Sequence, residues 1–181
     1  MRKIPTLFAR NHDTDHLVRD EITPGTEWVV AGEGTATRKF DGTCVLVRDG
    51  KVFKRYDAKP GRLPPGDFEP VEDPDPVTGH RPGWVPADLT APMERWLAEA
   101  IPTPLPLPGT FELIGPRING NPEKVRTHCL ARHGRFLLFD APRTFDQLRE
   151  YLSHADIEGI VWHHPDGRMV KIKKRDFGLK R

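Results

Sequence analysis

Proline is concentrated in the middle of the chain, and this limits what the chain can fold into. Thirteen of the 19 prolines lie between Pro60 and Pro108 of the 181-residue sequence. Because proline lacks a backbone N–H and fixes φ, this stretch favours turns and extended segments over long helices or central strands. We therefore predict a single domain over residues 1–181, with a proline-rich insert at about residues 60–108.

The composition excludes several classes of protein. The formal net charge is only +2, and four tryptophans and nine phenylalanines argue against a disordered chain. The sequence has no stretch of roughly 18 apolar residues and no signal-peptide pattern. Neither Cys44 and Cys129 nor His128, His133 and the pair His163-His164 have the paired spacing of metal ligands. These features predict a cytoplasmic protein with reduced cysteines.

Short apolar runs separated by turn residues predict antiparallel sheet. The clearest is a hairpin in which Asp49-Gly50 joins residues 44–47 to residues 52–53. Further strands are predicted at residues 110–114, 135–139, 159–162 and 169–172. Helices are predicted at residues 92–100, with Thr90 as the cap, and at residues 145–152, with Thr144 as the cap. This pattern predicts an α+β domain built on antiparallel sheet.

The run Arg38-Lys39-Phe40-Asp41-Gly42-Thr43 stands directly before the predicted hairpin. A Lys-x-Asp-Gly pattern also occurs by chance in charged turns, so alone it indicates little. Its weight comes from four elements that follow it in order: Glu112 in Phe-Glu-Leu-Ile-Gly, Phe139-Asp140, Glu158-Gly159-Ile160-Val161, and Lys171-Ile172-Lys173.

This ordered series resembles the covalent nucleotidyltransferase superfamily of DNA ligases, RNA ligases and messenger-RNA capping enzymes. Residues 112–122 are most similar to RNA ligases, and residues 74–86 resemble the small vertebrate-type 5′–3′ RNA ligases. The resemblance implies an ATP-grasp-like ligase adenylation domain, here without an OB-fold domain. It also implies an ATP-dependent RNA ligase that adenylylates itself, transfers AMP to an RNA 5′-phosphate and seals it to a 3′-hydroxyl.

The resemblance implies that the lysines carry out the chemistry. Lys39 would attack the α-phosphorus of ATP through its neutral amine, within a nucleotide-binding motif that includes Asp41 and Gly42. Lys171 and Lys173 would contact the α-phosphate and favour the neutral amine through like-charge repulsion. Strand alternation places Lys171 and Lys173 on one face, with apolar residues opposite.

Other residues would hold the nucleotide, the metal ion and the RNA. By resemblance, Glu112 contacts the ribose hydroxyls, and Glu158 holds Mg²⁺ or, in its place, Mn²⁺. Phe139 would stack on adenine, with Phe136 as the alternative. Arg55 would bind phosphate or the RNA end, although an ordinary surface arginine is an equal alternative.

Two other interpretations stay open at this point. One is a different polynucleotide nucleotidyltransferase, either a DNA ligase or a guanylyltransferase-like enzyme. The other is a nucleotide- or RNA-binding module without catalysis. The ligase interpretation predicts ATP and a divalent cation as cofactors, and RNA with 5′-phosphate and 3′-hydroxyl ends as the partner, held largely through its phosphates.

Overall fold

The computed structural model describes residues 1–76 and 78–181, which form two compact units. The first unit contains Met1–Lys3 and Asp41–His133, and the second contains Ile4–Phe40 and Gly134–Arg181. Both combine antiparallel sheet with short helices, which confirms the predicted mixed α+β class. The single domain over residues 1–181 stays a prediction. Within the described part of the chain, no helix is both long enough and apolar enough to cross a membrane.

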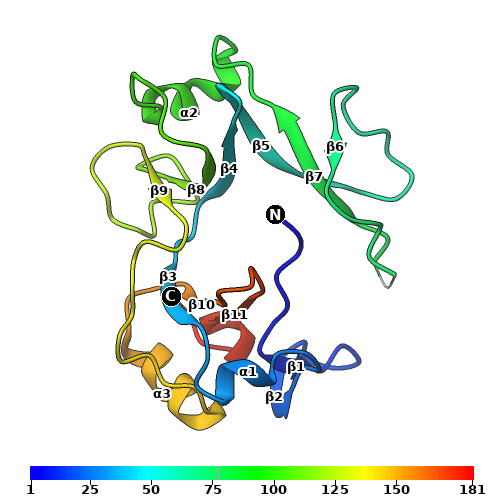
Figure 1. Ribbon diagram of the computed structural model, residues 1–181, viewed down its shortest axis with the longest axis vertical. Helices are drawn as coiled ribbons and strands as arrows, with labels where there is room; N and C mark the ends of the chain where they lie inside the picture. Colours follow the sequence, from blue (N-terminus) through cyan, green and yellow to red (C-terminus); the bar gives the residue numbers. More distant parts are fainter. Residues whose placement is uncertain (77) are drawn as a thin grey trace. The chain divides into compact units, whose positions relative to one another are not determined.

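The first unit is built on a six-stranded antiparallel sheet in the order β6-β7-β5-β4-β8-β9 (Figure 1). Its strands are β4 (Thr43–Arg48), β5 (Lys51–Ala58), β6 (Glu69–Pro70), β7 (Arg81–Pro86), β8 (Gly109–Ile114) and β9 (Cys129–Arg132). Asp49 and Gly50 join β4 to β5, with φ values of 53° and 69°. Two consecutive positive φ values are typical of tight hairpin turns, so the predicted hairpin is confirmed.

The proline-rich insert contributes a helix and two strands to this unit. The 3₁₀ helix η1 (Pro92–Glu94) leads into α2 (Arg95–Ala100), so the predicted helix is confirmed, although Ala91 precedes it in the N-cap position and Thr90 does not. Leu97 and Ala100 of α2 pack with the buried valines of β4 and β5 and with apolar residues of β8. Strands β6 and β7 also lie in the insert, which therefore belongs to the sheet.

The second unit contains a three-stranded sheet, a two-stranded sheet and two α-helices. Its elements are β1 (Phe8–Arg10), β2 (Val18–Ile22), α1 (Glu27–Val30), β3 (Thr35–Lys39), α3 (Phe145–His154), β10 (Gly159–His163), β11 (Met169–Lys173) and the 3₁₀ helix η2 (Lys174–Phe177). The order in the larger sheet is β11-β10-β3, and β1 pairs with β2.

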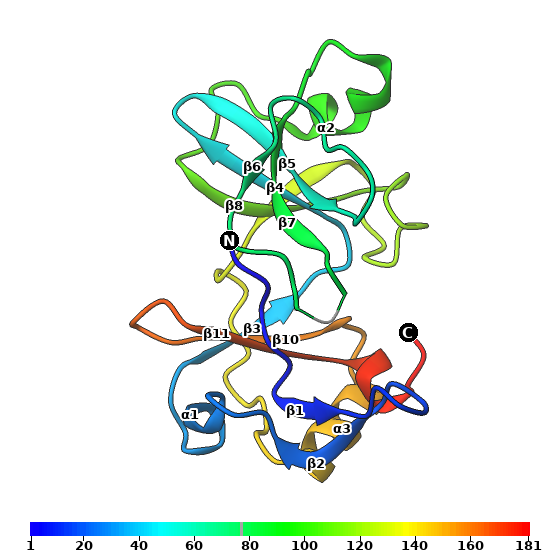
Figure 2. The ribbon, with the colours of Figure 1, turned by 90° about the vertical axis from the view of Figure 1, so that its right-hand side faces the viewer.

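Helix α3 packs on one face of the three-stranded sheet (Figure 2). Leu148 and Leu152 of the helix are fully buried and share a core with Ile160, Val170 and Ile172 of the sheet. Thr144 occupies the N-cap position of α3 as predicted, but its hydroxyl hydrogen-bonds the Gln147 side chain. The core is therefore confined to one face, and the other face is left for the polar residues of β3 and β11.

The predicted strand at residues 135–139 is wrong. This segment is irregular, with a single bridge between Leu137 and Thr37 and a hydrogen bond from the Arg38 N–H to the Phe136 carbonyl oxygen. Phe136, Leu137 and Phe139 are exposed, and Leu138 alone of this apolar run packs against the core. The run therefore lacks the alternating burial that would hold a strand in a sheet.

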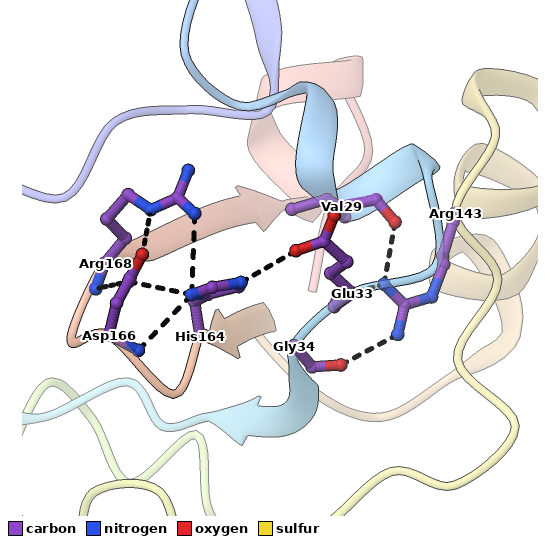
Figure 3. Close-up of polar contacts among 7 residues, drawn as sticks. All are labelled: Val29, Glu33, Gly34, Arg143, His164, Asp166 and Arg168. Carbon is purple, nitrogen blue, oxygen red and sulfur yellow. Dashed lines mark hydrogen bonds and ion pairs between the residues drawn. The ribbon is translucent and has the colours of Figure 1, made fainter.

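A network of charged side chains fixes the turn between β10 and β11 (Figure 3). His164 places Nε2 2.8 Å from Glu33 Oε2 and Nδ1 2.8 Å from Asp166 Oδ1. The hydrogen bond with Glu33, followed by the contact with Asp166, raises the pKa of His164. Arg168 donates to the other oxygen of Asp166 at 2.7 Å. The network joins this turn to the loop before β3. The beginnings of β3 and β11, the two strands that carry the candidate lysines, are therefore held together.

Candidate active site

Three lysines gather on the polar face of the three-stranded sheet. Lys39 at the end of β3 and Lys173 at the end of β11 are both cross-strand partners of Gly159. Lys171 lies two residues from Lys173 and is the partner of Val161. Directly opposed residues in an antiparallel pair point to the same face, so the three lysine side chains share one side of the sheet.

Gly159 leaves no side chain between Lys39 and Lys173. A Cβ atom at this position would lie 2.1 Å from the Ile172 carbonyl oxygen and 2.8 Å from the Lys173 Cα. Strands β10 and β11 therefore approach each other too closely for any residue other than glycine. The row across the sheet is lysine, glycine, lysine, so no other side chain of this row stands between the two lysines.

Glu158 is the carboxylate nearest to the candidate nucleophile. Its Oε2 lies 2.5 Å from Lys39 Nζ, and Lys39 also donates to the Phe40 carbonyl oxygen at 3.3 Å. Both side chains of the pair are mostly buried, at 24% and 18% exposed. Mg²⁺ prefers oxygen ligands and usually takes one or two carboxylates together with water and phosphate oxygens. Glu158 is therefore suited to hold such an ion beside a phosphate.

Burial and mutual repulsion make the lysine group electrostatically strained. Burial, followed by the positive charges of Lys173 and Lys39, lowers the pKa of Lys171 to about 8. Burial also lowers the pKa of Lys173, and the Asp176 carboxylate partly opposes this effect. Buried cations that repel one another favour an anionic ligand. A phosphate group meets that requirement.

Asp176 is a site residue that the sequence analysis missed. It is fully buried, and its Oδ2 accepts the backbone N–H of Lys173 at 2.8 Å. Its Oδ1 accepts a hydrogen bond from Arg10 Nη2 at 2.5 Å. Asp176 therefore fixes the end of β11 and the position of Lys173. The available signal was an acidic residue three positions after Lys173, as in the capping box that opens η2.

The boundary between the two units falls inside the Lys-x-Asp-Gly motif, so its last residues belong to the first unit. The Gly42 N–H donates to Glu112 Oε1 at 3.2 Å, and the Asp41 N–H donates to Glu123 Oε1 at 2.8 Å. Asn119 Nδ2 in turn donates to Asp41 Oδ1 at 2.9 Å. The structure thus brings Glu112 next to Gly42, as two residues of one nucleotide-binding site would require.

His133 and Cys44 complete the surroundings of Glu112, and the sequence analysis did not connect either residue with it. His133 Nε2 lies 2.9 Å from Glu112 Oε2, and Cys44 is the direct cross-strand partner of Glu112. Sequence spacing gave no signal for this group, because its members come from three different strands or strand ends.

Arg55 is placed on β5 in the first unit. Its guanidinium carbon lies over the Trp84 ring, 5.5 Å from the ring centroid, and the side chain donates to the Met1 carbonyl oxygen. These contacts are with groups other than the predicted nucleotide-binding residues, so a role for Arg55 at an RNA end stays a prediction.

The two aromatic candidates differ in their surroundings within the second unit. The Phe139 side chain is 88% exposed. Phe136 is 47% exposed, and its ring meets Phe40 edge to face with 4.7 Å between centroids. A largely exposed ring offers both faces for stacking, whereas one already in contact offers less. Stacking of either ring on adenine stays a prediction.

Comparisons with known proteins match the chain to RNA ligases. A family model described as RNA ligase 1 matches residues 99–181, which include Glu112, Glu158, Lys171 and Lys173. RNA ligase 1 of Rattus norvegicus is 28% identical over an alignment of 270 positions, which covers 98% of this chain and 81% of the rat protein.

Shorter matches point the same way. RNA ligase 1 of Danio rerio is 32% identical over 136 residues, covering 56% of this chain and 42% of the fish protein. RNA ligase 1 of Pongo abelii is 33% identical over 144 residues, covering 61% of this chain and 43% of the relative. The chain is therefore related to RNA ligases. More narrowly, it is similar to vertebrate RNA ligase 1 proteins, which confirms the resemblance drawn from its motifs.

Proposed function

We propose that this protein is an ATP-dependent RNA ligase that forms a covalent lysyl-AMP on Lys39. The observation that carries the proposal is the row of Lys39, Gly159 and Lys173, with Lys171 on the same face and Glu158 beside Lys39. In the first step, the amine of Lys39 attacks the α-phosphorus of ATP. A nitrogen–phosphorus bond forms, the bond to the pyrophosphate oxygen breaks, and the amine proton passes to solvent.

The surrounding residues have distinct roles in this proposal. Lys171 and Lys173 stabilise the negative charge that shifts on the phosphates as pyrophosphate leaves. Glu158 holds Mg²⁺ or Mn²⁺, which supplies neutralisation of phosphate charge. Glu112 accepts hydrogen bonds from the ribose hydroxyls, and Phe139, or alternatively Phe136, stacks on adenine.

The two later steps transfer AMP to the 5′-phosphate of an RNA and then seal the strand. The phosphate attacks the α-phosphorus of lysyl-AMP and releases Lys39, and a 3′-hydroxyl oxygen then attacks the 5′-phosphorus and displaces AMP. RNA is proposed as the substrate because the relatives are RNA ligases. The antiparallel sheets and the ordered motifs support an adenylation domain of the nucleotidyltransferase, ATP-grasp-like class.

Transfer of a labelled nucleotide tests the proposal directly. The purified protein is incubated with α-labelled ATP and Mg²⁺, then with RNA bearing a 5′-phosphate, with 5′-hydroxyl RNA as the control. We expect label that survives denaturation on the protein, then moves to the 5′-phosphorylated RNA and disappears as the strand is sealed. Absence of protein label would favour a binding module. Preferential labelling by GTP would favour a guanylyltransferase, and sealing of DNA nicks alone would favour a DNA ligase.

A further inference from the structure

Cys44, Glu112 and His133 form a compact group of metal-binding side chains in the first unit. One ligand atom from each residue lies within 4.8 Å of the other two. Cys44 on β4 faces Glu112 on β8, and His133 directly follows β9, the next strand of the sheet. The His133 N–H also donates to the Thr110 carbonyl oxygen at 3.1 Å. Backbone pairing across three neighbouring strands therefore fixes the Cα positions of the three residues.

The imidazole of His133 is oriented in the way that metal-binding histidines require. Its Nε2 faces Glu112 Oε2 at 2.9 Å, while its Nδ1 lies 3.0 Å from Thr110 Oγ1. Histidines that bind metals generally use the second ring nitrogen in a hydrogen bond that fixes the ring. Thr110 would supply that bond. The Glu112 and His133 side chains are 12% and 23% exposed, so the group is enclosed but remains accessible to solvent ions.

We propose that Cys44, Glu112 and His133 bind a zinc ion. Zinc accepts sulfur, nitrogen and oxygen ligands together, at about 2.3 Å for thiolate and about 2.0–2.2 Å for imidazole and carboxylate. Tetrahedral ligand atoms are then about 3.6 Å apart, so atoms already within 4.8 Å of one another need only small side-chain movements. Mg²⁺ prefers oxygen ligands and is a poor match for the thiol.

Binding requires proton changes at two of the ligands. The Cys44 thiol transfers its proton to solvent, and the resulting thiolate forms the sulfur–zinc bond. His133 would bind through Nε2 without a proton, so the hydrogen bond to Glu112 Oε2 breaks and the remaining ring proton lies on Nδ1, facing Thr110 Oγ1. Glu112 would bind as the carboxylate. Three protein ligands leave a fourth position for water.

Zinc at this group would also act on the nucleotide site, a consequence that rests on the proposed function. Glu112 Oε1 accepts the Gly42 N–H, and Oε2 faces His133. A zinc ion bonded to Glu112 would draw its negative charge away from the ribose hydroxyls. Zinc is therefore expected to slow the formation of lysyl-AMP.

Cobalt(II) is the probe for the binding site, because a bound thiolate gives a charge-transfer band in the near ultraviolet. The wild-type protein should show this band together with tetrahedral ligand-field bands, and zinc should abolish both. Cys44→Ser should lose the charge-transfer band, and His133→Gln should bind at least about tenfold more weakly. Cys129→Ser is the matched control and should keep the wild-type spectrum.

Two outcomes would overturn the zinc site. The first is a wild-type protein without the charge-transfer band, and the second is a band that survives in Cys44→Ser but disappears in Cys129→Ser. Circular dichroism of each variant shows whether it is folded. If Cys44→Ser is unfolded, His133→Gln decides the outcome, because wild-type affinity in that folded variant also contradicts the site.

The effect on the nucleotide site has a separate readout. Zinc added with ATP and Mg²⁺ should slow AMP attachment in the wild type and in Cys129→Ser, but not in Cys44→Ser. Equal inhibition of all three proteins would contradict the inhibitory role. If no protein forms an AMP adduct, the proposed ligase function fails, while the cobalt spectrum still decides whether the metal site exists.

Discussion

Lys39 and Lys173 lie on opposite sides of Gly159, each as its direct partner in the three-stranded sheet. Residues far apart in the sequence are thus placed in one row by backbone hydrogen bonds. A register shift of one residue would turn a lysine to the other face of the sheet. The register therefore fixes the positions of Lys39, the candidate nucleophile, and Lys173, the residue proposed to contact the phosphate.

Gly159→Ala should disturb both stability and catalysis. The added Cβ overlaps the Ile172 carbonyl oxygen and must push β11 away from β10. We expect a loss of about 1–3 kcal/mol in the free energy of unfolding, measured by denaturant titration, and a larger loss of AMP attachment because Lys173 moves. Gly66→Ala is the control, since nothing lies within 4 Å of a Cβ at that position. A Gly159→Ala protein with wild-type stability would contradict the close approach of these strands.

Lys173→Ala should impair the first chemical step. Loss of a preorganised cation at the α-phosphate commonly lowers the rate about 10²–10³-fold. The measurement is the single-turnover rate of AMP attachment at saturating ATP, with Lys51→Ala, an exposed residue of β5, as the control. A Lys173→Ala protein that is adenylylated at the wild-type rate would remove the role assigned to this residue.

Arg55→Ala should separate nucleotide transfer from RNA handling. If Arg55 binds the RNA end, the variant forms lysyl-AMP normally but seals poorly, even when it receives RNA that is already adenylylated. The contacts of Arg55 with Trp84 and Met1 suggest an alternative role, in which Arg55 stabilises the local structure and does not bind RNA. Normal sealing by a folded Arg55→Ala protein would therefore favour that structural role.

Lys171→Met should stabilise the protein at neutral pH. The pKa of Lys171 is about 8 in the folded state against 10.5 for an ordinary lysine, so the unfolded chain binds more protons between these values. The positive charges of Lys39 and Lys173 outweigh the opposing effects of Glu158 and Asp176. The destabilisation is complete below about pH 8 and is lost towards pH 10.5, so stability rises with pH across this window.

The expected gain is at most about 3 kcal/mol, and it should shrink as the pH rises through that window. Denaturant unfolding of the wild type and of Lys171→Met over a pH series measures it, with Lys51→Met as the control. The same variant should lose adenylylation activity, because the buried positive charge that destabilises the fold is also the charge that would bind the phosphate. A Lys171→Met protein that is less stable than the wild type at neutral pH would contradict the claim that the buried charge of Lys171 destabilises the folded protein.

Local sequence patterns predicted those elements in which the spacing of apolar residues along the sequence matches the pattern of buried side chains in the structure. Val170 and Ile172 are buried while Lys171 and Lys173 share the opposite face, as strand alternation requires. The Asp49-Gly50 turn likewise carries its own conformational preference. Strand β3 was not predicted, because Thr-Ala-Thr-Arg-Lys has no apolar alternation and is held by its pairing with β10.

The remaining features depend on contacts between distant segments. Nothing near His133 in the sequence indicates Glu112 or Cys44, since the register of β4, β8 and β9 brings them together. The apolar run at residues 135–139 has the local pattern of a strand without the tertiary contacts that would hold one. Its composition suits a strand, but the segment forms a single bridge, from Leu137 to Thr37, and most of its side chains are exposed.

The central claim is that Lys39 carries the AMP, and intact-mass spectrometry after incubation with ATP and Mg²⁺ tests it most directly. The wild-type protein should gain the mass of one AMP, and peptide mapping should place that mass on Lys39. Lys39→Ala should gain none, while Lys51→Ala should be modified like the wild type. An AMP adduct that persists in Lys39→Ala, or that maps to another residue in the wild type, would contradict the account.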